Sequence, residues 1–214
     1  MSDENRLWHN DTLGQKTVAA LNSNRFSATY VNTVAEGKAA VLELINTTDT
    51  VGIGGSVTVS EIGLLTELAK RGNTLYNHGV SGLTPEESLA IRRQELTADV
   101  FLTSTNAVTL DGQLVNVDGS GNRVAAMIFG PKKVIVVVGI NKIVKDTHDA
   151  YRRIQLVAAP INNKRLNRPN PCTVSGICQD CQGPTRICNV TTIIRKALPQ
   201  TPTHIIIIGE NLGF

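Results

Sequence analysis

The four cysteines of the chain lie within one short segment near the C-terminus. They are Cys172, Cys178, Cys181 and Cys188, with the spacing C-x5-C-x2-C-x6-C. Thiolates are metal ligands and redox groups, so this clustering predicts a metal site, a pair of disulfides or redox-active thiols. The N-terminal residues are polar and lack the apolar stretch of a secretory signal, so we expect a cytoplasmic protein, in which structural disulfides are rare. We therefore expect residues 172–188 to form a metal-binding loop.

The spacing of the cysteines bears on which metal they hold. A four-cysteine zinc site usually takes two C-x2-C pairs, and only Cys178 and Cys181 form one here. Iron–sulfur clusters also take four thiolates, and their spacings vary more widely. The preceding stretch 152–168 has five basic residues and no acidic one, which would balance the negative charge of either site. We expect a four-iron (4Fe–4S) cluster, with zinc, and metal-free thiols or disulfides, as the alternatives.

A glycine-rich stretch follows the short apolar run 51–53 and leads into a helical pattern. Glycines let a backbone approach an anion closely, and the N–H groups at the start of a helix attract negative charge. The stretch is neither a G-x-G-x-x-G fingerprint nor a P-loop. The alternative is that the glycines only make a turn and a hydroxyl caps the helix. The predicted ligand-binding residues here are Gly54, Gly55, Ser56 and Thr58.

Several polar residues follow other apolar runs or surround the hairpin signal Asp111-Gly112. Lys142 could stabilise an oxyanion or bind a carboxylate, and Asp111 is a candidate base. A solvated loop lysine and a turn aspartate are the alternatives. His78 follows the short run 74–76 and either faces the same site or is an ordinary loop residue. The predicted catalytic residues are Asp111, Asn122, Arg123 and Lys142, and Asn106 and Asn141 are further predicted ligand-binding residues.

Apolar, β-branched runs alternate with helical patterns along the chain. Because the runs are continuously apolar, they predict strands of a sheet covered by helices on both faces. Strands that alternate with helices indicate an α/β fold with a largely parallel sheet, whose ligands bind beyond the carboxyl ends of the strands. The predicted strands are 51–53, 99–103, 133–138 and 204–208, and the predicted helices are 33–46, 58–71, one that begins at Thr84-Pro85, 146–159 and 189–198.

Length and composition limit the class of protein further. The chain has 214 residues, and we expect residues 1–214 to form one large domain. The net charge of +3 is too small for a general nucleic-acid-binding protein. No run approaches the roughly 20 apolar residues that a membrane helix needs. No Ser-His-Asp or H-E-x-x-H pattern is visible, which argues against a hydrolase.

Several motifs, in order, resemble those of the LUD (lactate-utilisation) domain family. The resemblance extends from about Thr12 to Phe214, and the cysteine segment with the ending GENLG (209–213) resembles a subgroup of short LUD proteins. The motifs that carry it are GIGGS (52–56), TSTNAVTLDG (103–112), GNRVAA (121–126), GPKK (130–133) and GINK (139–142).

The resemblance implies a fold like that of the ribose-phosphate isomerases, glucosamine-phosphate isomerases and CoA transferases. Those relatives bind phosphosugars, CoA esters or folates at the strand ends, beside a loop like residues 52–58. Some LUD proteins take part, with iron–sulfur partners, in oxidising L-lactate to pyruvate. The resemblance thus implies a small anionic metabolite as ligand, an iron–sulfur or flavoprotein redox partner, and a homo-oligomer. This chain itself has no flavin or nicotinamide motif.

Three functions remain open at this point. The first is a redox-associated protein of organic-acid metabolism that carries an iron–sulfur cluster. The second is an isomerase-like or transferase-like enzyme in which the metal is structural. The third is a ligand sensor without catalytic activity.

Overall fold

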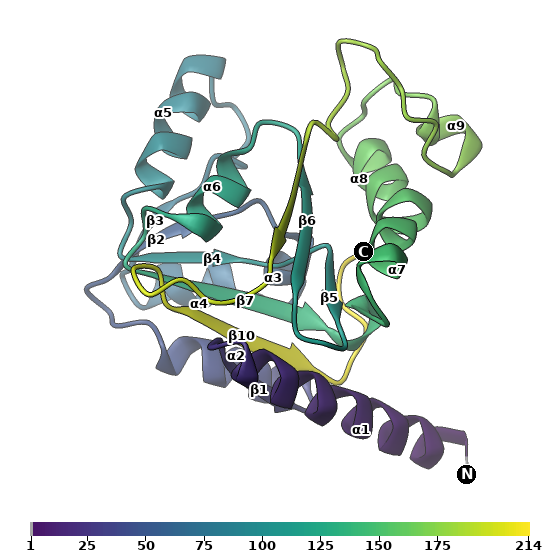
Figure 1. Ribbon diagram of the computed structural model, residues 1–214. Coiled ribbons are helices and arrows are strands. Elements are labelled where there is room, and N and C mark those ends of the chain that lie inside the picture. Colours follow the sequence, from purple (N-terminus) through teal and green to yellow (C-terminus); the bar gives the residue numbers. More distant parts are fainter. Residues whose placement is uncertain (1) are drawn as a thin grey trace.

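The computed structural model describes residues 2–214, and its centre is a six-stranded sheet (Figure 1). All neighbouring strands of this sheet pair in parallel, which confirms the predicted α/β fold. The four predicted strands are present. The strand order is β1 (Ser27–Val31), β10 (Thr203–Ile208), β7 (Lys133–Gly139), β4 (Val100–Thr103), β2 (Thr50–Ile53) and β3 (Thr74–Tyr76).

Alternate side chains of the central strands pack into two separate cores. In β7, Ile135 and Val137 join the core on one face, whereas Val134, Val136 and Val138 join the core on the other. Since both faces are buried, the strand is apolar at every position, as a covered parallel sheet requires. The first core is closed by α2 (Val34–Glu43), α3 (Val57–Glu61) and α4 (Leu64–Lys70), and the second by α1 (Ser2–Ser23) and α6 (Asn122–Ile128).

Local signals explain where several helices begin and end. Thr33 and Glu36 form a capping box at α2, and Thr84 and Glu87 form another at α5 (Pro85–Glu95), with Pro85 in its first turn. The predicted helix 58–71 is divided into α3 and α4, because Gly63 adopts a φ of 70° between them, a conformation that glycine adopts freely.

A second sheet lies beyond the carboxyl ends of the central strands. Its order is β8 (Ile143–Val144), β5 (Ala107–Thr109), β6 (Leu114–Asp118) and β9 (Val190–Ile194). Strands β5 and β6 form the predicted hairpin. The helix predicted over 189–198 is wrong, because β9 occupies that position and pairs antiparallel with β6. Its sequence VTTII consists entirely of β-branched residues, which favour a strand.

The helix predicted over 146–159 is longer and less regular than expected. It comprises α7 (Thr147–Arg153), a π-helical turn η2 (Ile154–Ala158) and α8 (Ala159–Arg165). Pro160 has no N–H to continue the α-helical hydrogen bonds, and the widened turn precedes it. The short helix α9 (Cys172–Ser175) opens the cysteine segment, and a 3-10 turn, η1 (Ile140–Lys142), follows β7. No helix within residues 2–214 is long and apolar enough to cross a membrane.

Candidate functional site

A cleft of about 440 Å³ lies at the carboxyl edge of the central sheet. After β2 the chain continues into α3 and α4, which pack in the core on one face of the central sheet. After the neighbouring β4 it continues into the β5–β6 hairpin, which packs in the core on the other face. Adjacent strands whose connections diverge in this way leave a crevice between them, the usual ligand site of such sheets. Residues from the ends of β2, β3, β4 and β7 meet there, together with Phe214.

The predicted glycine loop lines this cleft. Gly55 has a φ of 66°, and a Cβ on Gly54 would lie 2.6 Å from Oγ1 of Thr103, so both positions require glycine. The Ser56 hydroxyl accepts a hydrogen bond from the backbone N–H of Val59 at 3.2 Å and so caps α3. The loop therefore makes a turn and caps a helix, as the alternative interpretation expected, and it also forms one wall of the cleft.

Lys142 lies at the base of the cleft and is only 3% exposed. Its Nζ donates hydrogen bonds to Thr58 Oγ1 at 2.8 Å and to Ser104 Oγ at 3.0 Å. No acidic side chain among residues 3–214 forms an ion pair with it. Burial, and then the charges of Arg153 and Arg123, lower the pKa of Lys142 to about 7. The amine therefore titrates near neutral pH and faces the cleft without a carboxylate partner.

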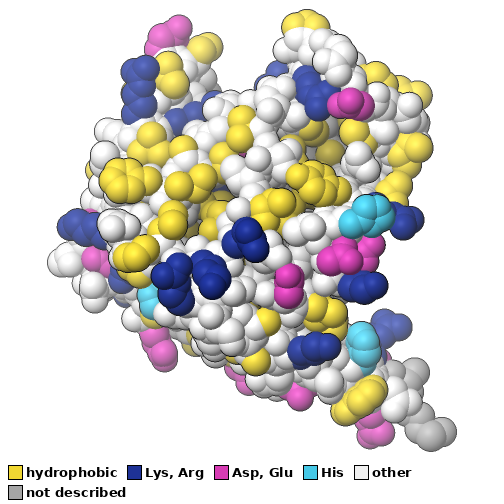
Figure 2. Space-filling view, viewed as in Figure 1, with side chains coloured by type: hydrophobic (Ala, Val, Ile, Leu, Met, Phe, Trp, Pro, Cys, Tyr) yellow, Lys and Arg dark blue, Asp and Glu magenta, His cyan; other side chains and the backbone are white. Residues whose placement is uncertain are grey.

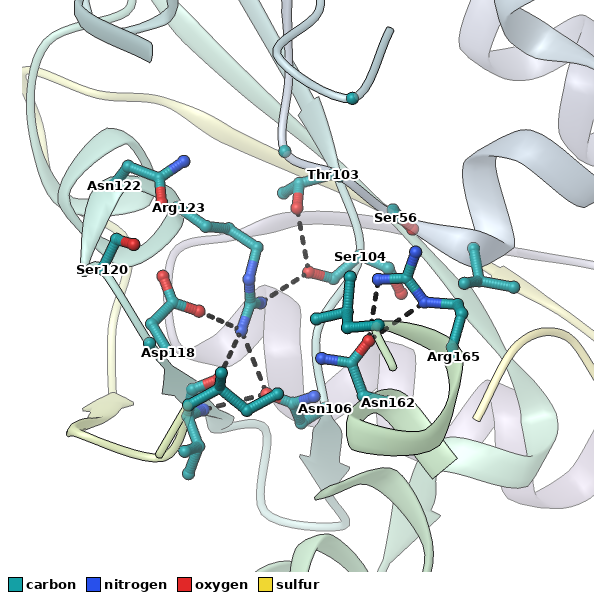
Figure 3. Close-up of a pocket in the computed structure, with 18 of the residues that line it drawn as sticks. Ser56, Thr103, Ser104, Asn106, Asp118, Ser120, Asn122, Arg123, Asn162 and Arg165 are labelled. Atoms are coloured by element: carbon teal, nitrogen blue, oxygen red, sulfur yellow. Dashed lines mark hydrogen bonds and ion pairs between the residues drawn. The ribbon is translucent and has the colours of Figure 1, made fainter. Parts of the chain in front are cut away.

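Arg123 is the centre of a hydrogen-bond network between β6 and the loop that precedes β5 (Figure 3). It forms an ion pair with Asp118 at 2.6 Å, and the second oxygen of Asp118 accepts from the backbone N–H of Val124 at the start of α6. Both terminal nitrogens of the Arg123 guanidinium are thus engaged in holding the hairpin. Its other acceptors are Ser104 O at 3.1 Å, Asn116 Oδ1 at 2.5 Å, Asn106 Oδ1 at 3.0 Å and Val117 O at 3.1 Å.

Further cationic side chains around the cleft have only neutral hydrogen-bond partners. Arg92 donates to the Ser120 hydroxyl at 3.2 Å, and Arg165 donates to Asn162 Oδ1 at 3.1 and 2.8 Å. Arg168 lines the same cleft. Among the lining residues the acidic one is Asp118, and Arg123 neutralises it. The cleft therefore carries an excess of positive charge, which favours an anionic ligand.

The structure brings most of the predicted site residues together but places two of them elsewhere. Asn106 and Asn122 line the cleft, beside Lys142 and Arg123. Asp111 lies in the exposed hairpin turn, where its carboxylate accepts hydrogen bonds from the Thr109 hydroxyl and from Gln113. This placement corrects the expectation that Asp111 lies near the glycine loop, because a turn carboxylate satisfied by its neighbours does not reach the strand ends.

Asn141 also has a different position from the one expected. Its side chain accepts from the Leu212 N–H at 3.0 Å and donates to the Gly213 carbonyl at 3.3 Å. It does not line the cleft. Asn141 instead fastens the C-terminal segment, whose last residue, Phe214, is part of the cleft wall.

The contact between His78 and Glu95 at the cleft could not be predicted from the sequence. His78 lines the cleft, and its Nδ1 lies 2.6 Å from Oε1 of Glu95, which is 1% exposed. The sequence signal for His78 is its place just after a short strand. Glu95 has no such signal, because its burial depends on α5 packing against β2.

The cysteine segment is held in place at both ends and across its middle. Asn170 donates to the Thr185 carbonyl at 2.9 Å and accepts from the Thr185 hydroxyl at 2.7 Å, which closes the loop between them. Arg186 donates to the carbonyl groups of Cys188 at 3.0 Å and Cys181 at 2.5 Å, and it pairs with Asp180 at 2.8 Å. These contacts tie the backbone at two of the four cysteines, Cys181 and Cys188, to one arginine.

The four thiols are close enough to influence one another's ionisation. Burial, then the charge of Cys178, raises the pKa of Cys188 to about 11. Burial, then the charges of Cys181 and Cys178, raises the pKa of Cys172. Nevertheless, no three cysteine sulfurs lie within 4.8 Å of one another in the described part of the chain. A tetrahedral zinc site with bonds of about 2.3 Å would bring its sulfurs to about 3.8 Å.

The cysteine segment reaches the edge of the cleft. Ile187, which precedes Cys188, lines the cleft, and its Cα lies 3.3 Å from the position that a Cβ on Gly119 would take. The space-filling view shows the molecule hollowed between α5 and the cysteine segment (Figure 2). The walls of the cleft thus include the glycine loop and Ile187, the residue that precedes Cys188.

These features define an α/β protein with a parallel sheet and a positively charged cleft at its strand ends. The LUD domain model matches residues 14–208, so the chain belongs to the LUD domain family. This confirms the resemblance found in the sequence.

A solved structure has the same fold. It is the crystal structure of a DUF162 family protein from Deinococcus radiodurans, which has 14% sequence identity and a TM-score of 0.54. The similarity covers 93% of this chain and 98% of that one. No curated protein matches the sequence.

Proposed function

We propose that the protein binds a small organic acid in the strand-end cleft and holds an iron–sulfur cluster in the adjacent cysteine segment. The observation that carries the proposal is the position of this cationic cleft, between the glycine loop and Ile187. The family supports a role in lactate-type metabolism. The cluster would exchange electrons with a redox partner protein.

The charges of the cleft favour a carboxylate over a neutral ligand. Lys142, Arg92 and Arg165 have no carboxylate partners within the described part of the chain, so a bound acid would supply the missing counter-charge. The volume of about 440 Å³ is in the range of small-molecule sites. In this arrangement Lys142 contacts an oxygen of the ligand, and the arginines orient its carboxylate.

The donor set of the cysteine segment, four free thiols in one loop, is the set that an iron–sulfur cluster takes. In a four-iron cluster each thiolate binds a different iron, so the sulfurs lie further apart than around one zinc ion. The spacing of Cys172, Cys178, Cys181 and Cys188 contains one C-x2-C pair, whereas a four-cysteine zinc site usually takes two. Such a cluster supplies one-electron transfer when bound. Arg186, donating to two carbonyl groups of the segment, would hold the loop around it.

The two parts of the proposal have separate tests. Protein purified without oxygen should contain iron and sulfide and show broad visible absorption, and Cys181→Ser should lower the iron content. Stoichiometric zinc without visible absorption would refute the cluster. Titration calorimetry should show binding of pyruvate or L-lactate but not of neutral lactamide, and Lys142→Met should weaken it at least about tenfold. The matched control is Lys145→Met, at an exposed lysine nearby. Equal affinity for the acids and lactamide would refute the anionic ligand.

A further inference from the structure

His78 presents one ring nitrogen to the cleft and the other to a buried carboxylate. It follows β3 at the carboxyl edge of the sheet, and its Nδ1 lies 2.6 Å from Oε1 of Glu95. The same oxygen accepts from the backbone N–H of His78 at 3.3 Å. The other nitrogen, Nε2, lies 3.4 Å from the position that a Cβ on Gly55 would take. The ring is thus held with Nε2 facing the glycine loop.

Glu95 has no other strong partner in the described part of the chain. It is 1% exposed, its Oε2 has no hydrogen-bond partner, and the side chain that contacts its Oε1 is His78. A buried carboxylate is costly unless it is paired, and its retention beside a histidine indicates a role in that pair. A base whose second nitrogen is oriented by a carboxylate is the usual arrangement for proton transfer.

The same loop is also contacted by a group that can stabilise negative charge. Lys142 Nζ is hydrogen bonded to Thr58, three residues after Gly55, so His78 and Lys142 flank one loop. Both line the cleft, together with the arginines available for a carboxylate. A base, an oxyanion donor and an anion site are the groups needed to remove a proton next to a carbonyl.

We propose that His78 is the proton-transfer residue of the cleft, that Glu95 is its positioning residue, and that the substrate class is an anionic compound with a C–H next to a carbonyl. The proposal rests on the anionic ligand proposed above. Nε2 takes the proton, the electron pair of the C–H bond forms the C=C bond of an enolate, and the carbonyl oxygen takes the negative charge beside Lys142. Return of the proton to carbon completes a cycle in which nothing is oxidised or reduced.

The orientation of the ring can be tested without any ligand. In protein with 15N-labelled histidine, the Nδ1–H of His78 should give a distinct downfield proton signal, since it donates to a buried carboxylate. Glu95→Gln should shift this signal strongly upfield, and His78→Asn should remove it. His9→Asn, at an exposed residue of α1, is the control and should leave it in place. A signal that is unchanged in Glu95→Gln would overturn the role of Glu95.

Proton transfer itself can be followed with pyruvate as the probe. In D2O, the protein should replace the methyl protons of pyruvate by deuterium, which proton NMR measures directly. His78→Asn should lower the rate about 10²- to 10⁴-fold, the usual contribution of a general base. Glu95→Gln should lower the rate with little change in KM, whereas a merely structural residue would change the melting temperature. His9→Asn should retain the full rate.

The outcomes separate this inference from the proposed function. If calorimetry shows that pyruvate binds but the wild-type protein does not exchange its protons, the role of His78 is refuted and the anionic ligand stands. Equal rates of deuterium exchange into pyruvate in wild type and His78→Asn would likewise refute the role of His78 and leave the anionic ligand in place. If pyruvate does not bind at all, the proposed ligand fails, and with it the substrate class.

Discussion

Replacement of Lys142 by methionine should change how the stability of the protein depends on pH. The pKa of Lys142 is lowered from 10.5 to about 7 in the folded protein, mainly because the amine is buried. Between these two values the unfolded chain binds a proton that the folded protein does not. Stability therefore rises with pH across this window, and the cost of burying the amine is greatest below pH 7.

The expected size follows from the two pKa values, 10.5 in the unfolded chain and about 7 in the folded protein. By linkage, the cost of burying Lys142 is about 4 kcal/mol at pH 7 and about 2 kcal/mol at pH 9. Methionine has no titrating group and a similar length. The wild type should therefore gain about 2 kcal/mol more than Lys142→Met between pH 7 and pH 9.

Urea unfolding at the two pH values measures this difference directly. Taking the difference between wild type and variant cancels the contributions of other groups that titrate in the same range. Lys145→Met, at an exposed lysine nearby, should follow the wild type. If the free energy of unfolding depends on pH in the same way in wild type and Lys142→Met, the pKa of Lys142 is not lowered by burial. The claim that this amine titrates near neutral pH in the cleft is then wrong.

Two other substitutions test the difference between a supporting residue and a turn residue. Arg123→Met should destabilise the protein by about 3–5 kcal/mol in urea unfolding, because it leaves the buried Asp118 carboxylate without its ion-pair partner. A loss below about 1 kcal/mol would show that the hydrogen-bond network of Arg123 does not stabilise the fold. Asp111→Ala should cost only about 1 kcal/mol and leave pyruvate affinity in calorimetry unchanged, because the residue lies in an exposed turn away from the cleft; a tenfold loss of affinity would restore it to the site.

Sequence alone predicts those elements whose signals are local. The strands 133–138 and 204–208 are continuously apolar, and the helix at Thr84 has both a capping box and a proline, so each is visible within a few residues. The sequence does not reveal helix α1 and strand β1, because α1 is largely polar and packs through a few side chains such as Leu13, Val18 and Leu21. The apolar spacing of β9 fits a helix as well as a strand; its β-branched residues favour the strand, and pairing with β6 stabilises it.

Part of the site could also be predicted, because some of its residues directly follow strands that the sequence predicts. Residues that follow strands, such as Ser56, Asn106 and Lys142, meet at the cleft because a parallel sheet brings all its carboxyl ends to one edge. Asp111 also follows a strand, but that strand belongs to the hairpin and ends away from this edge. The burial of Glu95 beside His78 depends on how α5 packs, which no local pattern shows.

The cysteine segment is attached at both ends to walls of the cleft. At its start, Asn170 is hydrogen bonded to Asn163 of α8, the helix that also carries Arg165. At its end, the Asn189 N–H donates to the Asp118 carbonyl at 2.9 Å, and β9 then pairs along β6. Asp118 lines the cleft and holds Arg123. The same helix and strand thus support both residues 172–188 and the walls of the cleft, so a metal group bound in this segment would be held in a fixed position relative to the cleft.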